Sequence, residues 1–212
     1  MSSMQYHWEI LDKHRLGLLP KLTAFKSRFY LAGGTAVALY LGHRDSIDFD
    51  FFTEKDFDSL SLMEELKTIF QDSRIEQKMS RNNTLIITVD GVDMSFFKIN
   101  EKQLEPFNET EYFNIASLTD IGCMKLSAIL GRSVLKDYVD LYAICKTIMP
   151  LSELLEKAKL KYPTVNRGAF VRALGYYGDI QINKIIFKND FYVDIKTIEE
   201  FFNSEIKKLF GV

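Results

Sequence analysis

Apolar and polar residues alternate with a period of two in several short segments before residue 100. Residues 46–52 are typical, because Phe49 and Phe51 alternate there with Asp48 and Asp50. Successive side chains of a strand point to opposite faces, so this pattern predicts a strand. We predict further strands at residues 29–32, 74–79, 84–89 and 92–99. The Asp90-Gly91 pair between the last two strands predicts a tight hairpin turn.

Helical spacing of apolar residues predicts the other elements. In the first half we expect helices at residues 4–28, 35–41 and 57–70, with the first helix broken near Gly17 and Pro20. From Ser117 onward almost every segment has this spacing. We predict helices there at residues 119–130, 136–149, 151–160, 167–175 and 193–209.

The change of pattern near residues 100–116 divides the chain into two halves. Strands and helices mix before it, and helices alone follow it. We therefore expect an α+β protein, with a mixed sheet and flanking helices at residues 1–115 and a helical bundle at residues 116–212.

Composition narrows the class of protein. The chain has 212 residues, 47% of them hydrophobic, and a net charge of −2, so a sizeable core is expected and any nucleic-acid contact must use a local patch. Lys157, Lys159, Lys161 and Arg167 could form such a patch, or simply a solvated helix face. The first residues lack a signal-peptide pattern and no apolar run is long enough to cross a membrane, which predicts a cytoplasmic protein.

The two cysteines have spacing that fits no zinc site. Cys123 and Cys145 both lie in apolar helical patterns, without a nearby histidine. We expect two buried, reduced thiols.

Two carboxylates in a strand of Phe and Ile are the first sign of chemistry. Asp48 and Asp50 share one face of the predicted strand, where like charges repel unless a cation joins them. Magnesium binds through one or two carboxylates and substrate phosphates. The other interpretation is an edge strand with one solvated face.

A glycine pair precedes the carboxylates at a predicted strand-to-helix turn. Gly33 and Gly34 would let the backbone approach a phosphate, and the helix N-terminus offers free N–H groups to an anion. Thr35 could add a hydroxyl. A phosphate site beside a metal site is how a nucleoside triphosphate with magnesium would be held.

Asp93 is a candidate third carboxylate. It lies on the strand after the predicted hairpin and points the same way as Ser95, opposite to its apolar neighbours. A solvated hairpin aspartate is an equally good interpretation.

Two sequence blocks resemble a known family. LAGGTAVALYLGHRDSIDFDFF, residues 31–52, has the strand, Gly-Gly-Thr, helix and Asp-x-Asp order of the DNA polymerase β-like nucleotidyltransferases. Within them it resembles the AbiEii/AbiGii toxins of bacterial toxin–antitoxin and abortive-infection systems. SLTDIGCMKLSAILGR and LKDYVDLYAI, residues 117–132 and 135–144, resemble the second block of that family. Many superfamily members have Gly-Ser where this chain has Gly-Gly.

The resemblance implies a polymerase-β-like sheet and roles for residues of the second block. It assigns Lys125 a contact to the triphosphate, whereas the residues alone allow a lysine that snorkels to solvent. It places Asp137 and Asp140 in the active site, as a base or as anchors for a cation. Arg132 could contact phosphate or act as a cation at a helix C-terminus.

Arg44 and His43 precede the carboxylates directly. Arg44 can bind a phosphate or pair with the aspartates, and His43 is expected to be only a loop residue.

The function implied is transfer of a nucleoside monophosphate from an NTP to an acceptor, with release of pyrophosphate. Asp48, Asp50 and Asp93 would hold magnesium, or manganese in its place. The acceptor would be RNA, such as tRNA, or a protein, and an antitoxin protein would restrain the enzyme. The helical half would contribute to the active site.

Two other functions remain compatible with the same residues. One is adenylylation of a small molecule such as an aminoglycoside, which needs an acidic acceptor pocket. The other is a nucleotide-binding module without turnover.

Overall fold

The computed structural model describes residues 5–211. The first residue of the predicted helix 4–28 and the last residue of the predicted helical half therefore lie outside the described residues. None of the helices in residues 5–211 has the length and apolar character needed to cross a membrane.

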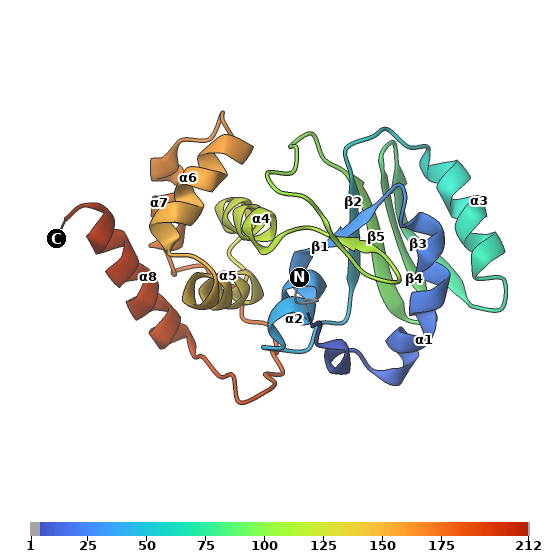
Figure 1. The fold of residues 1–212 in the computed structure, drawn as a ribbon, viewed down its shortest axis with the longest axis horizontal. Helices are drawn as coiled ribbons and strands as arrows, with labels where there is room; N and C mark the ends of the chain where they lie inside the picture. The colour runs from blue at the N-terminus through green and yellow to red at the C-terminus, as the bar shows by residue number, and fades with distance from the viewer. Residues whose placement is uncertain (1–4, 212) are drawn as a thin grey trace.

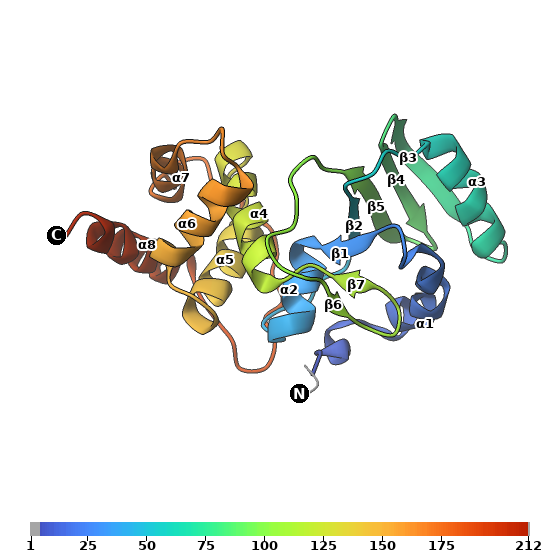
Figure 2. The ribbon, with the colours of Figure 1, turned by 45° about the horizontal axis from the view of Figure 1, so that its top comes forward.

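A mixed sheet of seven strands forms one half of the molecule (Figures 1 and 2). In chain order they are β1 Tyr30–Ala32, β2 Phe49–Thr53, β3 Ile75–Arg81, β4 Thr84–Val89, β5 Val92–Lys98, β6 Asn108–Glu109 and β7 Asn114–Ile115. In space the order is β3-β4-β5-β2-β1-β7-β6. The central strand β2 is antiparallel to β1 and parallel to β5.

The period of two determines which face of β2 and β5 is buried. Phe49 and Phe51 of β2 are 1% exposed and pack into the core, while Asp50 and Phe52 point to the opposite face. Strand β5 alternates in the same way, and Asp50 lies beside Ser95 in the register. One face of this strand pair is therefore free to line a site.

Turns and helix ends follow local sequence signals. Asp90 and Gly91 have φ values of 48° and 83°, the left-handed pair that a two-residue hairpin needs. The Asp58 side chain accepts a hydrogen bond from Ser61 N and begins a helix. The hairpin prediction is confirmed.

Helices flank the sheet. The first half contains α1 Lys13–Leu22, α2 Gly33–Leu41, α3 Ser59–Ile69 and the short 3₁₀ turns Trp8–Ile10 and Thr23–Phe25. Figure 1 shows α1 and α3 on the side of the sheet away from the C-terminal helices, and α2 between the sheet and those helices. Helix α2 is almost entirely buried.

The second half is helical from residue 118 to residue 174 and again near the C-terminus. Its helices are α4 Leu118–Gly131, α5 Leu135–Thr147, α6 Leu151–Lys161, α7 Arg167–Leu174 and α8 Ile195–Leu209. Ile121 of α4 packs with the sheet core, and Leu126 of the same helix packs with the helical core. Helix α4 thus joins the two hydrophobic clusters. Both cysteines are buried and free, as predicted.

Two local predictions were wrong. Helix α1 continues through Gly17 and Pro20 because Leu18, Leu19 and Leu22 are buried, which outweighs the hydrogen bond lost at Pro20. Strands β6 and β7 lie in a segment predicted to be only a polar connection, since two residues are too few to show a period.

A buried ion pair anchors the segment that leads from the sheet to the helices. Lys161 at the end of α6 donates to Asp120 Oδ1 at 2.7 Å, and both side chains are fully buried. Asp120 also accepts hydrogen bonds from the backbone N–H groups of Leu104 and Glu105. Lys161, which we had grouped with a possible basic surface, is therefore a core residue.

Loss of this anchor should destabilise the fold strongly. We expect Asp120→Ala to lower the free energy of unfolding by about 3–5 kcal/mol, because it leaves the Lys161 ammonium buried without a counter-charge, with only the Lys102 carbonyl oxygen as acceptor. Urea denaturation measures the change. The matched control is Glu64→Ala in the exposed Lys67–Glu64 pair, where a change below about 1 kcal/mol is expected. An equally small change for Asp120→Ala would contradict the assignment.

Candidate active site

A cavity of about 940 Å³ lies where the β2–β5 face meets α4 and the start of α5. The predicted site residues that line it are Gly33, Gly34, Arg44, Asp48, Asp50, Lys125, Arg132 and Asp137. Thr35, Asp93 and Asp140 do not line it. The structure thus brings together residues that are up to about 100 positions apart in the chain, by way of the packing of α4 and α5 against α2.

The glycine pair allows α2 to begin directly against the carboxylates. Gly33 has φ +72°, and a Cβ there would come within 2.7 Å of Asp50 Oδ2. A Cβ on Gly34 would come within 2.5 Å of Arg44 Nη2. No side chain caps the helix at Ala32, so the first N–H groups of α2 begin beside Asp50 without a capping oxygen.

Asp48 and Asp50 are carboxylates without a compensating cation. Among residues 5–211, no Lys, Arg or His forms an ion pair with either side chain. Burial raises the pKa of Asp50, the charge of Asp48 raises it further, and Lys125 opposes the shift. Burial and the charge of Asp93 raise the pKa of Asp48. A cation bound between Asp48 and Asp50 would therefore be electrostatically favourable.

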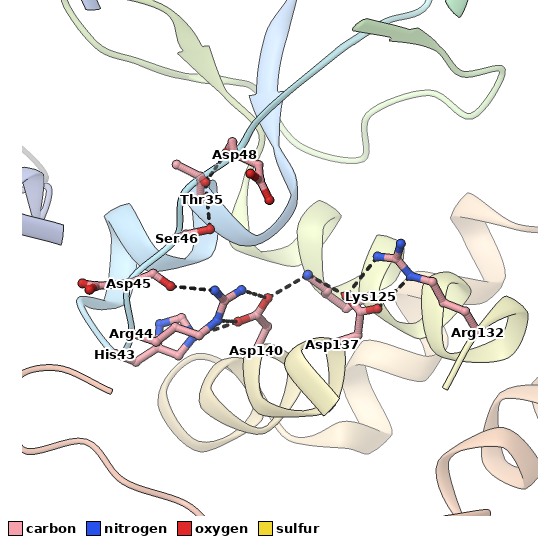
Figure 3. Close-up of polar contacts among 10 residues, drawn as sticks. All are labelled: Thr35, His43, Arg44, Asp45, Ser46, Asp48, Lys125, Arg132, Asp137 and Asp140. Atoms are coloured by element: carbon pink, nitrogen blue, oxygen red, sulfur yellow. Dashed lines mark hydrogen bonds and ion pairs between the residues drawn. The ribbon is translucent and has the colours of Figure 1, made fainter. Parts of the chain in front are cut away.

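Thr35 acts behind the cavity wall. Its side chain is buried; the hydroxyl donates to the Asp48 carbonyl oxygen and lies 2.8 Å from the Ser46 hydroxyl (Figure 3). Thr35, predicted as a phosphate contact, instead fixes the segment that enters β2. Ser46 lines the cavity in its place.

A chain of ion pairs forms the floor of the site, and its side chains are buried except for that of Arg132, which is 63% exposed (Figure 3). Arg44 donates from Nε and Nη2 to the two oxygens of Asp140, at 2.7 and 2.8 Å. Lys125 Nζ lies 2.7 Å from Asp140 Oδ2 and 2.8 Å from Asp137 Oδ1. Arg132 Nε donates to Asp137 Oδ2 at 3.0 Å. The network therefore links the α2–β2 loop to α4 and α5.

The charges in this network hold one another in the ionised state. Burial alone would raise the pKa of Asp140, but Arg44 and Lys125 keep that pKa well below its usual range. Burial would lower the pKa of Lys125, and Asp140 and Asp137 raise it instead. Lys125 is thus a charged ammonium at the cavity wall.

Comparison with known proteins identifies the family. The model of the family "Nucleotidyl transferase AbiEii toxin, Type IV TA system" matches residues 18–208. The chain belongs to this family.

Relatives of this AbiEii-family chain include proteins of known sequence and of known structure. Uncharacterized protein aq_aa25 of Aquifex aeolicus (strain VF5) is 37% identical over 190 residues, which cover 85% of this chain and 87% of the relative. MenT4, a nucleotidyltransferase toxin from Mycobacterium tuberculosis H37Rv, is similar in structure, with a TM-score of 0.59, 13% identity and coverage of 97% of this chain and 86% of MenT4. JHP933 from Helicobacter pylori has a TM-score of 0.55, 17% identity and coverage of 97% and 95%. The predicted fold class is confirmed.

Asp93 lies beside the AbiEii-family cavity and not in its wall. Lys78 donates to its Oδ1 at 2.6 Å. Within residues 5–211, no three Asp, Glu, His or Cys side chains are grouped closely enough to hold a metal ion by themselves. Asp48 and Asp50 therefore form a two-carboxylate site, which fits a magnesium ion that takes its other ligands from substrate and water.

His43 is a site residue that sequence reasoning missed. It is buried, and its Nε2 lies 2.9 Å from Asp140 Oδ1. Burial lowers the pKa of His43, so the neutral ring donates this hydrogen bond at pH 7. Its only signal in the sequence was its place beside Arg44.

A return segment of the chain after α7 closes one side of the cavity. Asn183, Lys184 and Ile186 line it. Asp45 N donates to the carbonyl oxygen of Ile186 at 2.8 Å. Sequence analysis predicted no element here, because this segment has neither helical nor strand periodicity.

The unpaired carboxylates should make the metal-free wild-type protein less stable than a variant in which one of them is neutral. We expect Asp50→Asn to raise the free energy of unfolding at pH 7 by on the order of 1 kcal/mol, since it removes a charge that burial disfavours. A carboxyl with a raised pKa in the folded state costs stability as pH rises. The gain should therefore shrink as the pH falls through the range where the carboxyl becomes protonated.

Thermal unfolding in EDTA between pH 4 and pH 8 measures this effect. The control is Asp56→Asn, because Lys98 and Asn83 lower the pKa of that exposed carboxylate and no gain is expected. A pH-independent loss of stability in Asp50→Asn would contradict the electrostatic account.

Proposed function

We propose that the cavity binds an NTP with magnesium and that the protein transfers the nucleoside monophosphate to an acceptor, releasing pyrophosphate. One observation carries the proposal. Asp48 and Asp50 face the cavity without an ion-pair partner among residues 5–211, beside the uncapped start of α2 and the charged Lys125. Membership of a nucleotidyl transferase family supports it.

Asp48 and Asp50 would hold magnesium, or manganese in its place. When bound, such an ion neutralises charge on the phosphates and lowers the pKa of the attacking oxygen. Asp93 completing the site as a third carboxylate stays a prediction, and it requires Asp93 to leave Lys78. Without that change, Asp93 acts on Asp48 through its charge alone.

The other residues divide into phosphate contacts and positioning residues. Lys125 and Arg132 face the cavity as cations, and the backbone of Gly33 and Gly34 offers N–H groups to phosphate oxygens. Arg44 and Asp140 hold each other and orient Lys125. The contacts of Arg44 with Asp140 thus favour the interpretation that Arg44 forms an ion pair over the one in which it binds a phosphate directly.

We place this activity in a toxin–antitoxin system of type IV, in the cytoplasm, with RNA such as tRNA or a protein as acceptor. The small-molecule alternative requires a free acidic pocket. Asp137 and Asp140, its best candidates, are neutralised by Lys125, Arg44 and Arg132. The presence of both Asp48 and Asp50 argues against a nucleotide-binding module without turnover.

Labelling tests the proposal. We expect transfer from one of four α-labelled NTPs to tRNA or to a protein in a cell lysate, in the presence of magnesium. Asp48→Asn and Asp50→Asn should each lower the rate by at least about 100-fold, because each removes a ligand charge at the transferring phosphate. Asp56→Asn should leave the rate unchanged. Label transfer by the double variant at the wild-type rate would refute the metal-site assignment.

A further inference from the structure

One end of the cavity is aromatic and has no part in phosphate or metal binding. Asp48 directly precedes β2, and the face of β2 that carries Asp50 continues to Phe52, because residues two apart in a strand share a face. On β5, Phe97 lies directly beside Phe52 in the register. Phe52 and Phe97 both line the cavity. The strand pair thus leads from carboxylates to aromatic rings along one wall.

These two phenylalanines differ from their neighbours in the sheet. Phe51 and Phe96 point to the other face and are at most 1% exposed in the core. Phe52 and Phe97 are half-buried, with ring centroids 5.6 Å apart. Phe52 also stacks on the buried ring of Tyr30, at 6.1 Å between centroids and 29° between planes. The rings are therefore held in place while part of their apolar surface faces the cavity.

The helical half also contributes apolar and aromatic groups to the cavity. Met124 and Ala128 of α4 line it, together with Tyr162, which directly follows α6. Lys161 next to Tyr162 is fixed by its buried pair with Asp120. The buried anchor of the fold therefore fixes the backbone directly before Tyr162.

We propose that Phe52, Phe97 and Tyr162 form the subsite for the nucleobase of the bound NTP. The inference rests on the proposed function, since the carboxylate end must take the phosphates. Phe52 lies about 7 Å along the strand from Asp50, a distance that one ribose can span. Planar bases stack on aromatic rings, and the interaction tolerates any base.

Comparison of two ligands that share a phosphate chain tests the subsite. Isothermal titration calorimetry with magnesium and without acceptor measures binding of each of the four NTPs and of inorganic tripolyphosphate. Phe52→Leu, Phe97→Leu and Tyr162→Leu keep an apolar side chain and remove the ring. We expect each to weaken NTP binding by about 10-fold and to leave tripolyphosphate binding unchanged.

Two variants serve as matched controls. Tyr162→Phe keeps the ring and should bind NTP as tightly as the wild type. Phe107→Leu removes a ring that also stacks on Tyr30, at 4.7 Å, but lies outside this cavity and is 39% exposed. It should bind both ligands as the wild type does.

The possible outcomes separate this inference from the proposed function. If the wild type binds neither ligand, the proposed function fails and the subsite fails with it. If the wild type binds both and the ring variants keep full NTP affinity, the phosphate site stands and the nucleobase subsite is overturned. It is also overturned if the ring variants keep NTP affinity and lose only transfer to an acceptor RNA, since the rings would then serve the acceptor. A parallel loss of NTP and tripolyphosphate affinity would likewise overturn it.

Discussion

The structure of the site depends on one buried carboxylate. Asp140 is fully buried and contacts Arg44, Lys125 and His43, which come from the loop before β2 and from α4. Burying an isolated charge costs several kcal/mol, so the Asp140 carboxylate depends on the cations Arg44 and Lys125. The loop that precedes β2 is therefore fixed to the helical half by ion pairs, at the place where the two hydrophobic clusters meet. Apolar packing brings the halves together, and the ion pairs determine how they align.

Carboxylates are paired with cations on one side of the cavity and unpaired on the other. Arg44, Lys125 and Arg132 pair with Asp137 and Asp140, whereas Asp48 and Asp50 face the cavity without an ion-pair partner among residues 5–211. Asp120, by contrast, is buried with a cation, Lys161. The unpaired carboxylates thus cost stability, and a bound cation would offset this cost. Lys125 belongs to both sides, since its charge also lowers the pKa of Asp50.

Periodicity predicted the parts of the site that lie on regular elements. The alternation around Asp50 gave its face, and the motif resemblance brought Lys125 and Asp137 to the same site. His43 and Lys161 could not be predicted, because their roles come from partners 97 and 41 positions away, with no pattern that marks the pairing. Thr35 was assigned to the cavity from its place in the motif, and its side chain points instead behind the wall. Sequence spacing thus predicts the direction of a side chain within a strand better than the direction of a side chain at the start of a helix.

The register of β2 connects these features. A slip by one residue would turn Phe51 into the cavity and Asp50 into the core, which would exchange the chemistry of the two faces. Three features oppose such a slip. Thr35 donates a hydrogen bond to the Asp48 carbonyl oxygen, and Gly33 leaves room for the Asp50 side chain where a Cβ would clash. The parallel pairing of β2 with β5 aligns Asp50 with Ser95. The same register sets Phe52 beside Phe97. It therefore also fixes the order of the groups along the cavity wall, from the carboxylates to the aromatic rings. The Gly-Gly-Thr turn therefore helps to determine which side chains of β2 face the cavity.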